Sequence, residues 1–77
     1  MIAIIVAYDS AAVLPACLES LAREGVQAIV VDNASSDASA VIAEEAGAAV
    51  IRNARNEGYG RAMNIGLRAA ASNSALE

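Results

Sequence analysis

The sequence predicts an α/β fold in which three strand–helix units form a small parallel sheet. Two observations support this prediction: apolar runs rich in isoleucine and valine recur three times, and a segment with helical periodicity follows each run. Strands that alternate with helices imply right-handed crossovers and parallel pairing. A chain of 77 residues has room for one compact unit. We therefore expect a single domain over residues 1–77, with a frayed tail over residues 72–77.

The first unit opens with the apolar run Ile2 to Ala7, whose branched residues are typical of a strand buried on both faces. A helix is expected over Ser10 to Arg23, with its regular part starting near Leu14, because Pro15 is tolerated in a first turn. Gly25 is expected to end this helix. Its predicted apolar face, in which the cysteine is a small core residue, comprises Val13, Leu14, Cys17, Leu18 and Leu21.

The second unit is expected to start with a strand over Gln27 to Val31. Ser35 or Ser36 is predicted to cap the following helix, and the charge of Asp37 in its first turn would complement the helix dipole. Gly47 is expected to end this helix. Its predicted buried side comprises Val41, Ile42 and Ala46.

The third unit is expected to contain a short strand over Ala48 to Ile51, a polar loop over Arg52 to Gly58 and a helix from about Tyr59 to Ala71. Apolar residues make up 57% of the chain, mostly alanine, valine and isoleucine, which suits slim helices on a parallel sheet. The predicted buried face of the third helix comprises Tyr59, Ala62, Met63, Gly66, Leu67 and Ala70.

Polar residues follow each predicted strand, and parallel strands bring all three clusters to one edge of the sheet. These clusters are Tyr8 to Ser10, Asp32 with Asn33, and Arg52 to Gly58. An acid beside an amide can read the donors and acceptors of a nucleobase, and arginines near a helix amino end suit phosphate. The same residues also have structural explanations, because Asp32 and Asn33 can shape a turn and the arginines can be solvated charges.

Composition excludes several classes of function. A formal charge of −4 argues against a nucleic-acid surface. The absence of histidine excludes a Ser–His or Cys–His nucleophile pair and the usual zinc site of histidine and cysteine. A single cysteine cannot form an internal disulfide. The opening run of Met1 to Ala7 is too short for a membrane span or a signal-peptide core, so we expect a cytoplasmic protein.

Three segments of the chain resemble the opening of family 2 glycosyltransferases. The first joins the segment Ile4 to Ser10, which starts in the expected first strand, with the helix segment Leu14 to Leu21, and the second is Val31 to Asp37. The third segment, Asn56 to Leu67, has the form common among rhamnosyltransferase-like members. The three motifs follow one another in the family's order and cover nearly all of the chain.

The resemblance implies the N-terminal half of a GT-A, Rossmann-like fold that binds a nucleotide diphosphate sugar of the dTDP or UDP type. By position, it assigns nucleotide binding to Ala7, Tyr8, Asp9, Asp32, Asn33, Gly58 and Arg61. Two of these positions depart from the family's common residues. Ala7 lacks the hydroxyl of a frequent threonine, and Asp9 replaces a frequent asparagine and adds a negative charge near the diphosphate.

The resemblance also implies Mg²⁺ or Mn²⁺, which family members hold with an Asp-x-Asp motif on a fourth strand, and a catalytic base further along. No Asp-x-Asp pair occurs in the sequence, so no metal ligand and no catalytic residue is assigned to this chain. We therefore expect a nucleotide-binding portion that does not catalyse transfer alone.

An alternative function is an assembly module. The run Ile2 to Ala7 would form an unprotected apolar edge of the sheet, which favours a homo-oligomer through this strand. A dinucleotide-binding half of a Rossmann fold is a third possibility. It is improbable, because Ala7 to Leu14 contains no glycine where the phosphate-binding fingerprint needs three.

Overall fold

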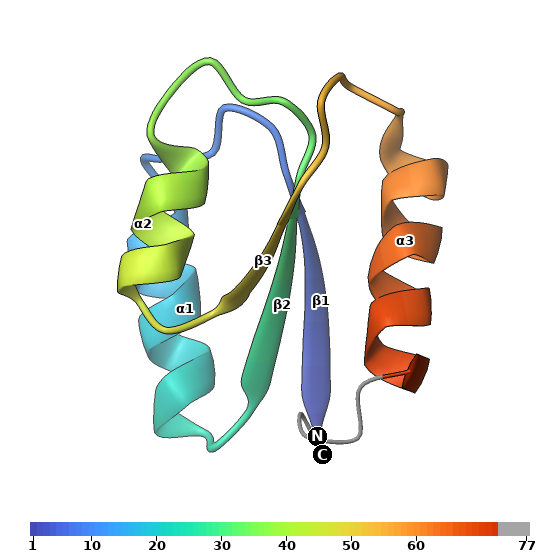
Figure 1. Ribbon diagram of the computed structural model, residues 1–77. Helices are drawn as coiled ribbons and strands as arrows, with labels where there is room; N and C mark the ends of the chain where they lie inside the picture. Colours follow the sequence, from blue (N-terminus) through green and yellow to red (C-terminus); the bar gives the residue numbers. More distant parts are fainter. Residues whose placement is uncertain (73–77) are drawn as a thin grey trace.

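The computed structural model describes residues 1–72 and confirms the α/β fold with a parallel three-stranded sheet (Figure 1). The strands lie in the order β1-β2-β3, and Ile5 pairs with Val30, which in turn pairs with Val50. Each strand boundary lies within one residue of its predicted position. The elements are β1 (Ile2–Ala7), α1 (Leu14–Arg23), β2 (Gln27–Asp32), α2 (Ser39–Glu45), β3 (Ala49–Arg52) and α3 (Tyr59–Ser72).

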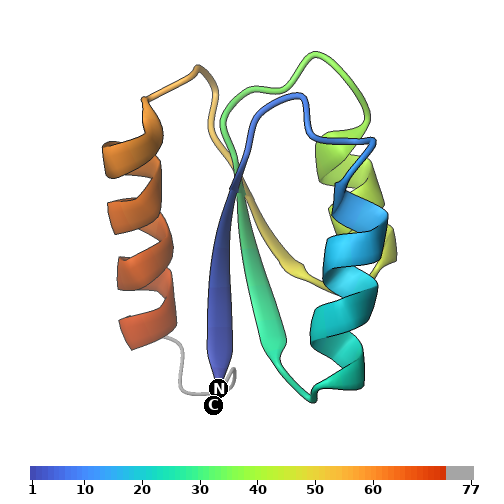
Figure 2. The same cartoon turned by 180° about the vertical axis from the view of Figure 1, so that it is seen from behind.

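The sheet is the middle layer of a three-layer arrangement, with α1 and α2 on one face and α3 on the other (Figures 1 and 2). Strand β2 is central, and its alternating side chains supply both cores. Val30 packs with Leu14 and Leu18 on the side of α1, whereas Ile29 and Val31 pack with Ala62 of α3. Full burial of each branched side chain contributes about 1.5–3 kcal/mol.

Within residues 1–72, β1 is an edge strand of the sheet, and the helices lie on the two faces of that sheet. Helices α1 and α2 both lie on the same face because both crossovers advance the sheet in one direction, from β1 to β3. Helix α3 crosses to the opposite face and packs against β1 and β2. Within residues 1–72, no strand pairs with the outer side of β1. The predicted open edge is therefore present in this part of the chain.

Glycine ends both helices on the first face, as predicted. Gly25 follows α1 with φ of +72°, and its N–H donates to the carbonyl of Ala22 while the next N–H, from Val26, donates to Leu21. Gly47 follows α2 with φ of +87° and begins the same pair of bonds. These are Schellman motifs, which need a residue without a Cβ at the left-handed position.

The buried face of α1 differs from the prediction. Leu14 and Leu18 are buried, but Val13 is 66% exposed and Cys17 is also exposed, so the cysteine is not a core residue. Each exposed residue precedes a buried leucine by one position, which rotates it by about 100° around the helix. The two leucines fill the space over β2, and the smaller side chains are left on the solvent side.

The predictions of the buried sides of α2 and α3 were also partly wrong. In α2, Ser39, Ala40 and Ala43 are buried, whereas Val41 is 45% exposed and Ala46 is exposed. These small residues let α2 lie close to its neighbours, and the bulkier valine is left outside.

In α3, Tyr59 and Leu67 are mostly exposed, and Ala62 and Gly66 make the closest approach to the sheet, flanked by half-buried Ile65. Ser72 still belongs to this helix, which corrects the expected start of the frayed tail, and the rest of that expected tail, residues 73–77, lies outside the described residues. No helix within residues 1–72 combines the length and the apolar character that crossing a membrane requires.

Candidate functional site

The loops that follow the three strands meet at one edge of the sheet, as the sequence predicted (Figure 1). Backbone hydrogen bonds join the strand ends there: the N–H of Asn33 donates to the carbonyl of Ala7 at 2.8 Å, and that of Asn53 donates to Asp32 at 2.9 Å. We call this edge, with its loops 8–13, 33–38 and 53–58, the rim. It is the place where open α/β sheets bind ligands.

Asp9 ties the first loop of the rim to the second. Its N–H donates to Ser35 Oγ at 2.9 Å, and its Oδ1 accepts from the N–H of Ser36 at 2.7 Å and from the Ser36 hydroxyl at 3.1 Å. The two serines are therefore not helix caps, which corrects the prediction. Asp9 has φ of +47°, an uncommon conformation for a residue with a Cβ. These cross-loop bonds hold its exposed carboxylate in place.

Asp32 shapes the turn at the end of β2. It is 4% exposed, and its two carboxylate oxygens accept from the N–H and the hydroxyl of Ser35 at 3.1 and 2.6 Å. Ala34, inside this turn, has φ of +62°. The structural explanation given for Asp32 is thus observed. A buried carboxylate at the rim also remains a strong acceptor for a ligand hydroxyl or N–H.

Asp37 lies before helix α2, whose cap residue is Ala38, and not in the first turn as predicted. Its carboxylate accepts from the N–H of Ser39 at 2.9 Å, from the Ser39 hydroxyl, and from the N–H of Ala11 at 3.1 Å. These bonds, led by the one from the Ser39 hydroxyl, hold the pKa of Asp37 below its ordinary value.

Ser39 is a structural residue of the rim that the sequence analysis missed. It is fully buried, and its Oγ accepts from the N–H of Ser10 at 2.8 Å. The Asp-x-Ser spacing of Asp37 and Ser39 was the local signal, since an Asp side chain often bonds the backbone two residues on.

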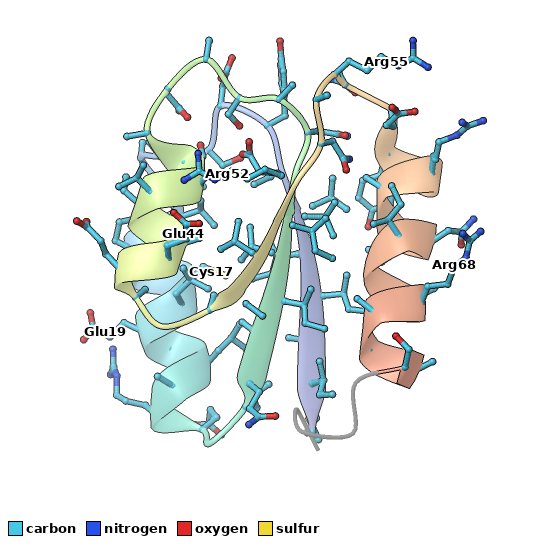
Figure 3. The ribbon with its side chains drawn as sticks, in the orientation of Figure 1. Cys17, Glu19, Glu44, Arg52, Arg55 and Arg68 are labelled. Atoms are coloured by element: carbon cyan, nitrogen blue, oxygen red, sulfur yellow. The ribbon has the colours of Figure 1, made fainter. Side chains whose placement is uncertain are left out.

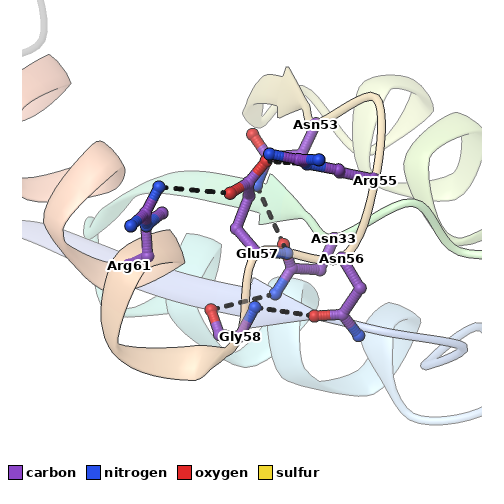
Figure 4. Close-up of polar contacts among 7 residues, drawn as sticks. All are labelled: Asn33, Asn53, Arg55, Asn56, Glu57, Gly58 and Arg61. Carbon is purple, nitrogen blue, oxygen red and sulfur yellow. Dashed lines mark hydrogen bonds and ion pairs between the residues drawn. The ribbon is translucent and has the colours of Figure 1, made fainter.

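Asn33 connects the second loop of the rim to the third (Figure 4). Asn33 is only 2% exposed. Oδ1 accepts from the N–H of Glu57 at 3.1 Å and from Asn53 Nδ2 at 2.9 Å, and Nδ2 donates to the carbonyl of Gly58 at 3.3 Å. A hydrogen bond from the N–H of Gly58 to Asn56 Oδ1 at 2.8 Å closes the loop before α3.

The predicted arginine cluster is only partly assembled. Arg52 pairs with Glu44 of α2, which raises the pKa of Arg52, and Figure 3 shows the two beside α2. Arg55 and Arg61 instead converge on the carboxylate of Glu57, at 3.2 and 3.6 Å (Figure 4). Both guanidinium groups are exposed, so each pair by itself is weak.

An open depression of about 640 Å³ begins at this end of α3 and continues along the helix. The residues that line it are Glu57, Arg61, Asn64, Ile65 and Arg68. The depression therefore adjoins the rim, and its charged side chains come from one helix and the loop before it.

The remaining predicted site residues differ in what they present at the rim. Tyr8 is 54% exposed, which leaves its ring accessible. Ala7 is fully buried among the leucines of α1, so its side chain faces the core. Gly58 has φ of +82°, and its carbonyl accepts the first bond of α3, from the N–H of Ala62 at 3.1 Å. It therefore places the amino end of α3 beside the loop.

The rim carboxylates of the described residues bond serine side chains and backbone amides rather than gather into a metal centre. Within residues 1–72, no group of three or more histidine, cysteine, aspartate or glutamate residues lies close enough to hold a metal ion. The carboxylates of Asp9, Asp32 and Asp37 each serve the serine hydroxyls and amides of the rim instead. The residues present therefore do not fit the divalent cation that the resemblance implies.

Comparison with known proteins supports the resemblance seen in the sequence. The sequence model of the family described as glycosyl transferase family 2 matches residues 2–74. Neither the curated proteins nor the solved structures gave a match. The family match spans nearly the whole chain and all three strands that build the rim. The chain therefore belongs to glycosyl transferase family 2.

Proposed function

We propose that the rim binds the nucleotide of a nucleotide diphosphate sugar, of the dTDP or UDP type. The chain would then supply the nucleotide-binding portion of a glycosyltransferase that moves a hexosyl or rhamnosyl group to an acceptor hydroxyl. One observation carries this proposal: in a member of family 2, the loops after all three strands converge at one edge of the sheet and are joined there by hydrogen bonds. The cytoplasmic location expected from the sequence remains a prediction.

The exposed groups of the rim and the buried carboxylate of Asp32 each have a suitable role in this proposal. The ring of Tyr8 offers a face for a base, and the carboxylates of Asp9 and Asp32 can accept from a base N–H or a ribose hydroxyl. Gly58 opens α3, whose first N–H groups have no partner within the helix, and the positive helix end favours phosphate. Arg61 lies one turn further on and adds a positive charge.

The test is an amide-resolved NMR titration of the chain with dTDP, UDP and ADP, with and without Mg²⁺. We expect saturable shifts confined to Tyr8, Asp9, Asp32 and the residues around Gly58 and Arg61. A well-dispersed spectrum that millimolar nucleotide leaves unchanged would refute nucleotide binding by this chain. Chemical-shift changes at the rim carboxylates with Mg²⁺ alone would contradict the conclusion that these residues do not fit a divalent cation.

The open edge of β1 favours the second candidate function, an assembly module that forms a homodimer. The carbonyls of Met1 and Ala7 accept hydrogen bonds from the N–H groups of Gln27 and Asn33, at the two ends of β2. Successive residues of a strand direct their N–H and C=O groups to opposite sides. Ile2, Ile4 and Val6 therefore direct their N–H and C=O groups outward. No charged residue or proline in β1 blocks a partner strand. A second copy would pair antiparallel about a two-fold axis at Ile4, which extends one sheet through both chains.

Light scattering at high micromolar concentration tests this second candidate. We expect a dimer for the natural sequence and a monomer for Ile2→Pro, which removes an outward N–H without breaking a bond to β2. A monodisperse monomer of the natural sequence would refute the assembly function. An Ile2→Pro variant that still dimerises would show that a different surface is used.

A further inference from the structure

The amide oxygen of Asn33 has no hydrogen-bonding capacity left for a ligand, and one of the two N–H groups of its Nδ2 is also in use. Oδ1 already accepts two hydrogen bonds, from the Glu57 N–H and from Asn53 Nδ2, and Nδ2 donates to the Gly58 carbonyl. An amide oxygen has two lone pairs, so both are in use. The residue is also only 2% exposed, beneath the loop that it bonds.

Its three partners span the whole connection between β3 and α3. Asn53 directly follows β3, Glu57 lies near the end of the loop, and Gly58 precedes α3. The Gly58 carbonyl accepts both the Asn33 amide and the first helical bond of α3, from Ala62. The loop between these points bonds mainly to itself, through Asn56 to Gly58 and Arg55 to Glu57. Asn33 is therefore the side chain that fixes this loop to the central strand.

Fixing the loop also fixes the charges that it carries. The Glu57 N–H that Asn33 accepts belongs to the residue whose carboxylate gathers Arg55 and Arg61. The side chain of Glu57 is only 21% exposed, so its position depends on its backbone. Displacement of this backbone would move both guanidinium groups and the amino end of α3 away from the rim.

We propose that Asn33 is a positioning residue, whose amide clamps the 53–58 loop so that Gly58, the amino end of α3 and Arg61 face the rim. Its side chain acts on the bound nucleotide only through this loop, in contrast to the direct nucleotide binding that the family resemblance assigned to Asn33. The nucleotide part of this proposal rests on the proposed function above, whereas the clamp itself is a property of the free chain.

Aspartate and alanine are the informative replacements at this position. Asn33→Asp keeps the size and the acceptor oxygens but replaces the donor to the Gly58 carbonyl with an oxygen, so the two acceptors repel. Asn33→Ala removes all three bonds and leaves the Glu57 N–H without an acceptor. Asn64→Asp is the matched control, because it makes the same chemical change at an exposed residue of α3.

The experiment combines hydrogen exchange of the free chain with a dTDP titration followed by NMR. In the natural sequence, we expect the Asn33 Nδ2 resonances to keep their positions with dTDP, while those of Tyr8 and Asp9 shift. In Asn33→Ala, we expect the Glu57 N–H to exchange at least 10-fold faster and dTDP affinity to fall at least 10-fold. Asn33→Asp should keep the Glu57 N–H protected and still bind dTDP more weakly, whereas Asn64→Asp should match the natural sequence in hydrogen exchange.

Each contrary outcome has a definite meaning. Contacts between Asn33 side-chain protons and the base or ribose, or unchanged dTDP affinity in Asn33→Ala, would overturn the positioning role. Unchanged exchange of the Glu57 N–H in Asn33→Ala would overturn the clamp. If dTDP shifts nothing in the natural sequence but exchange quickens in Asn33→Ala, the nucleotide proposal fails and the clamp is supported. The measurement on the natural sequence remains decisive even where a variant does not fold.

Discussion

Two glycines of α3 provide a matched pair that tests the close packing of this helix on the sheet. A Cβ at Gly66 would lie 2.5 Å from Ile4 Cγ2 and 3.1 Å from Val31 Cγ2, both of which belong to branched residues with stiff side chains. A Cβ at Gly60 would meet no atom within 4 Å. Both positions lie in the same helix, so the gain in helix propensity is similar in sign for both.

The expected magnitudes follow from these distances. Gly66→Ala forces α3 and the sheet apart and should cost about 1–3 kcal/mol as overpacking, against a propensity gain of up to about 1 kcal/mol. We expect Gly60→Ala to have an unchanged or slightly higher stability, and Gly66→Ala to be about 1–3 kcal/mol less stable than Gly60→Ala, because the propensity gain is shared by both. Urea unfolding followed by circular dichroism measures the stability of both variants. The urea midpoints are compared where the variants have the same m-value.

A coupled variant separates the clash from other effects of the added methyl group. Ile4→Ala removes the atom that a Cβ at Gly66 would meet first. Gly66→Ala should therefore cost less in the Ile4→Ala background than in the natural sequence, with a coupling of about 0.5 kcal/mol or more. A Gly66→Ala variant as stable as Gly60→Ala would refute the close approach of α3 to β1.

Four further predictions concern the rim. Ala34→Gly should raise the free energy of unfolding by about 0.5–1 kcal/mol, and with it the urea midpoint, because φ of +62° strains alanine more than ordering glycine costs; an unchanged midpoint would contradict that strain. The pKa of Asp37 is lowered, so its carboxylate contributes to stability at pH values above its ordinary pKa, and this contribution is lost as the pH falls through the lowered pKa. The stability of Asp37→Asn, measured by unfolding at a series of acidic pH values, should therefore lack this part of the pH dependence. Glu57→Gln frees Arg55 and Arg61 and should tighten dTDP binding by about two- to tenfold at low salt, whereas equal affinity by calorimetry would exclude these arginines from phosphate binding. Asp9→Asn keeps an acceptor for the Ser36 N–H and removes a charge, so it should tighten dTDP binding at low salt, while Asp9→Ala, which loses that bond, should not.

Local patterns in the sequence were sufficient for the element order and the ends of the helices. The branched runs locate each strand to within one residue, and Gly25 and Gly47 end helices because the left-handed conformation favours glycine locally. The convergence of the strand ends follows from parallel pairing alone, so the rim was predictable as a place.

The faces of the helices and the bonds within the rim were less predictable, because both depend on residues far apart in the sequence. Whether Val13 or Leu14 faces the sheet depends on the space over β2, and helical periodicity in the sequence carries no information about that space. Ser35 and Ser36 look like helix caps in isolation, but they bond Asp9, which lies more than 20 residues earlier. The contacts of Asn33 with Glu57 and Gly58 bridge a similar separation.

The cross-loop bonds of the rim also bear on how so short a chain could hold a ligand. A unit of this size buries a limited core, so its loops depend on polar contacts as well as on apolar packing. Two residues with a Cβ, Asp9 and Ala34, nevertheless adopt left-handed backbone conformations at the rim. Such conformations persist only where surrounding bonds determine them, and here these bonds run from loop to loop through Ser35 and Ser36. A loop ordered before the ligand arrives loses less entropy on binding, so the loop-to-loop bonds of the rim would favour the nucleotide binding that we propose for it.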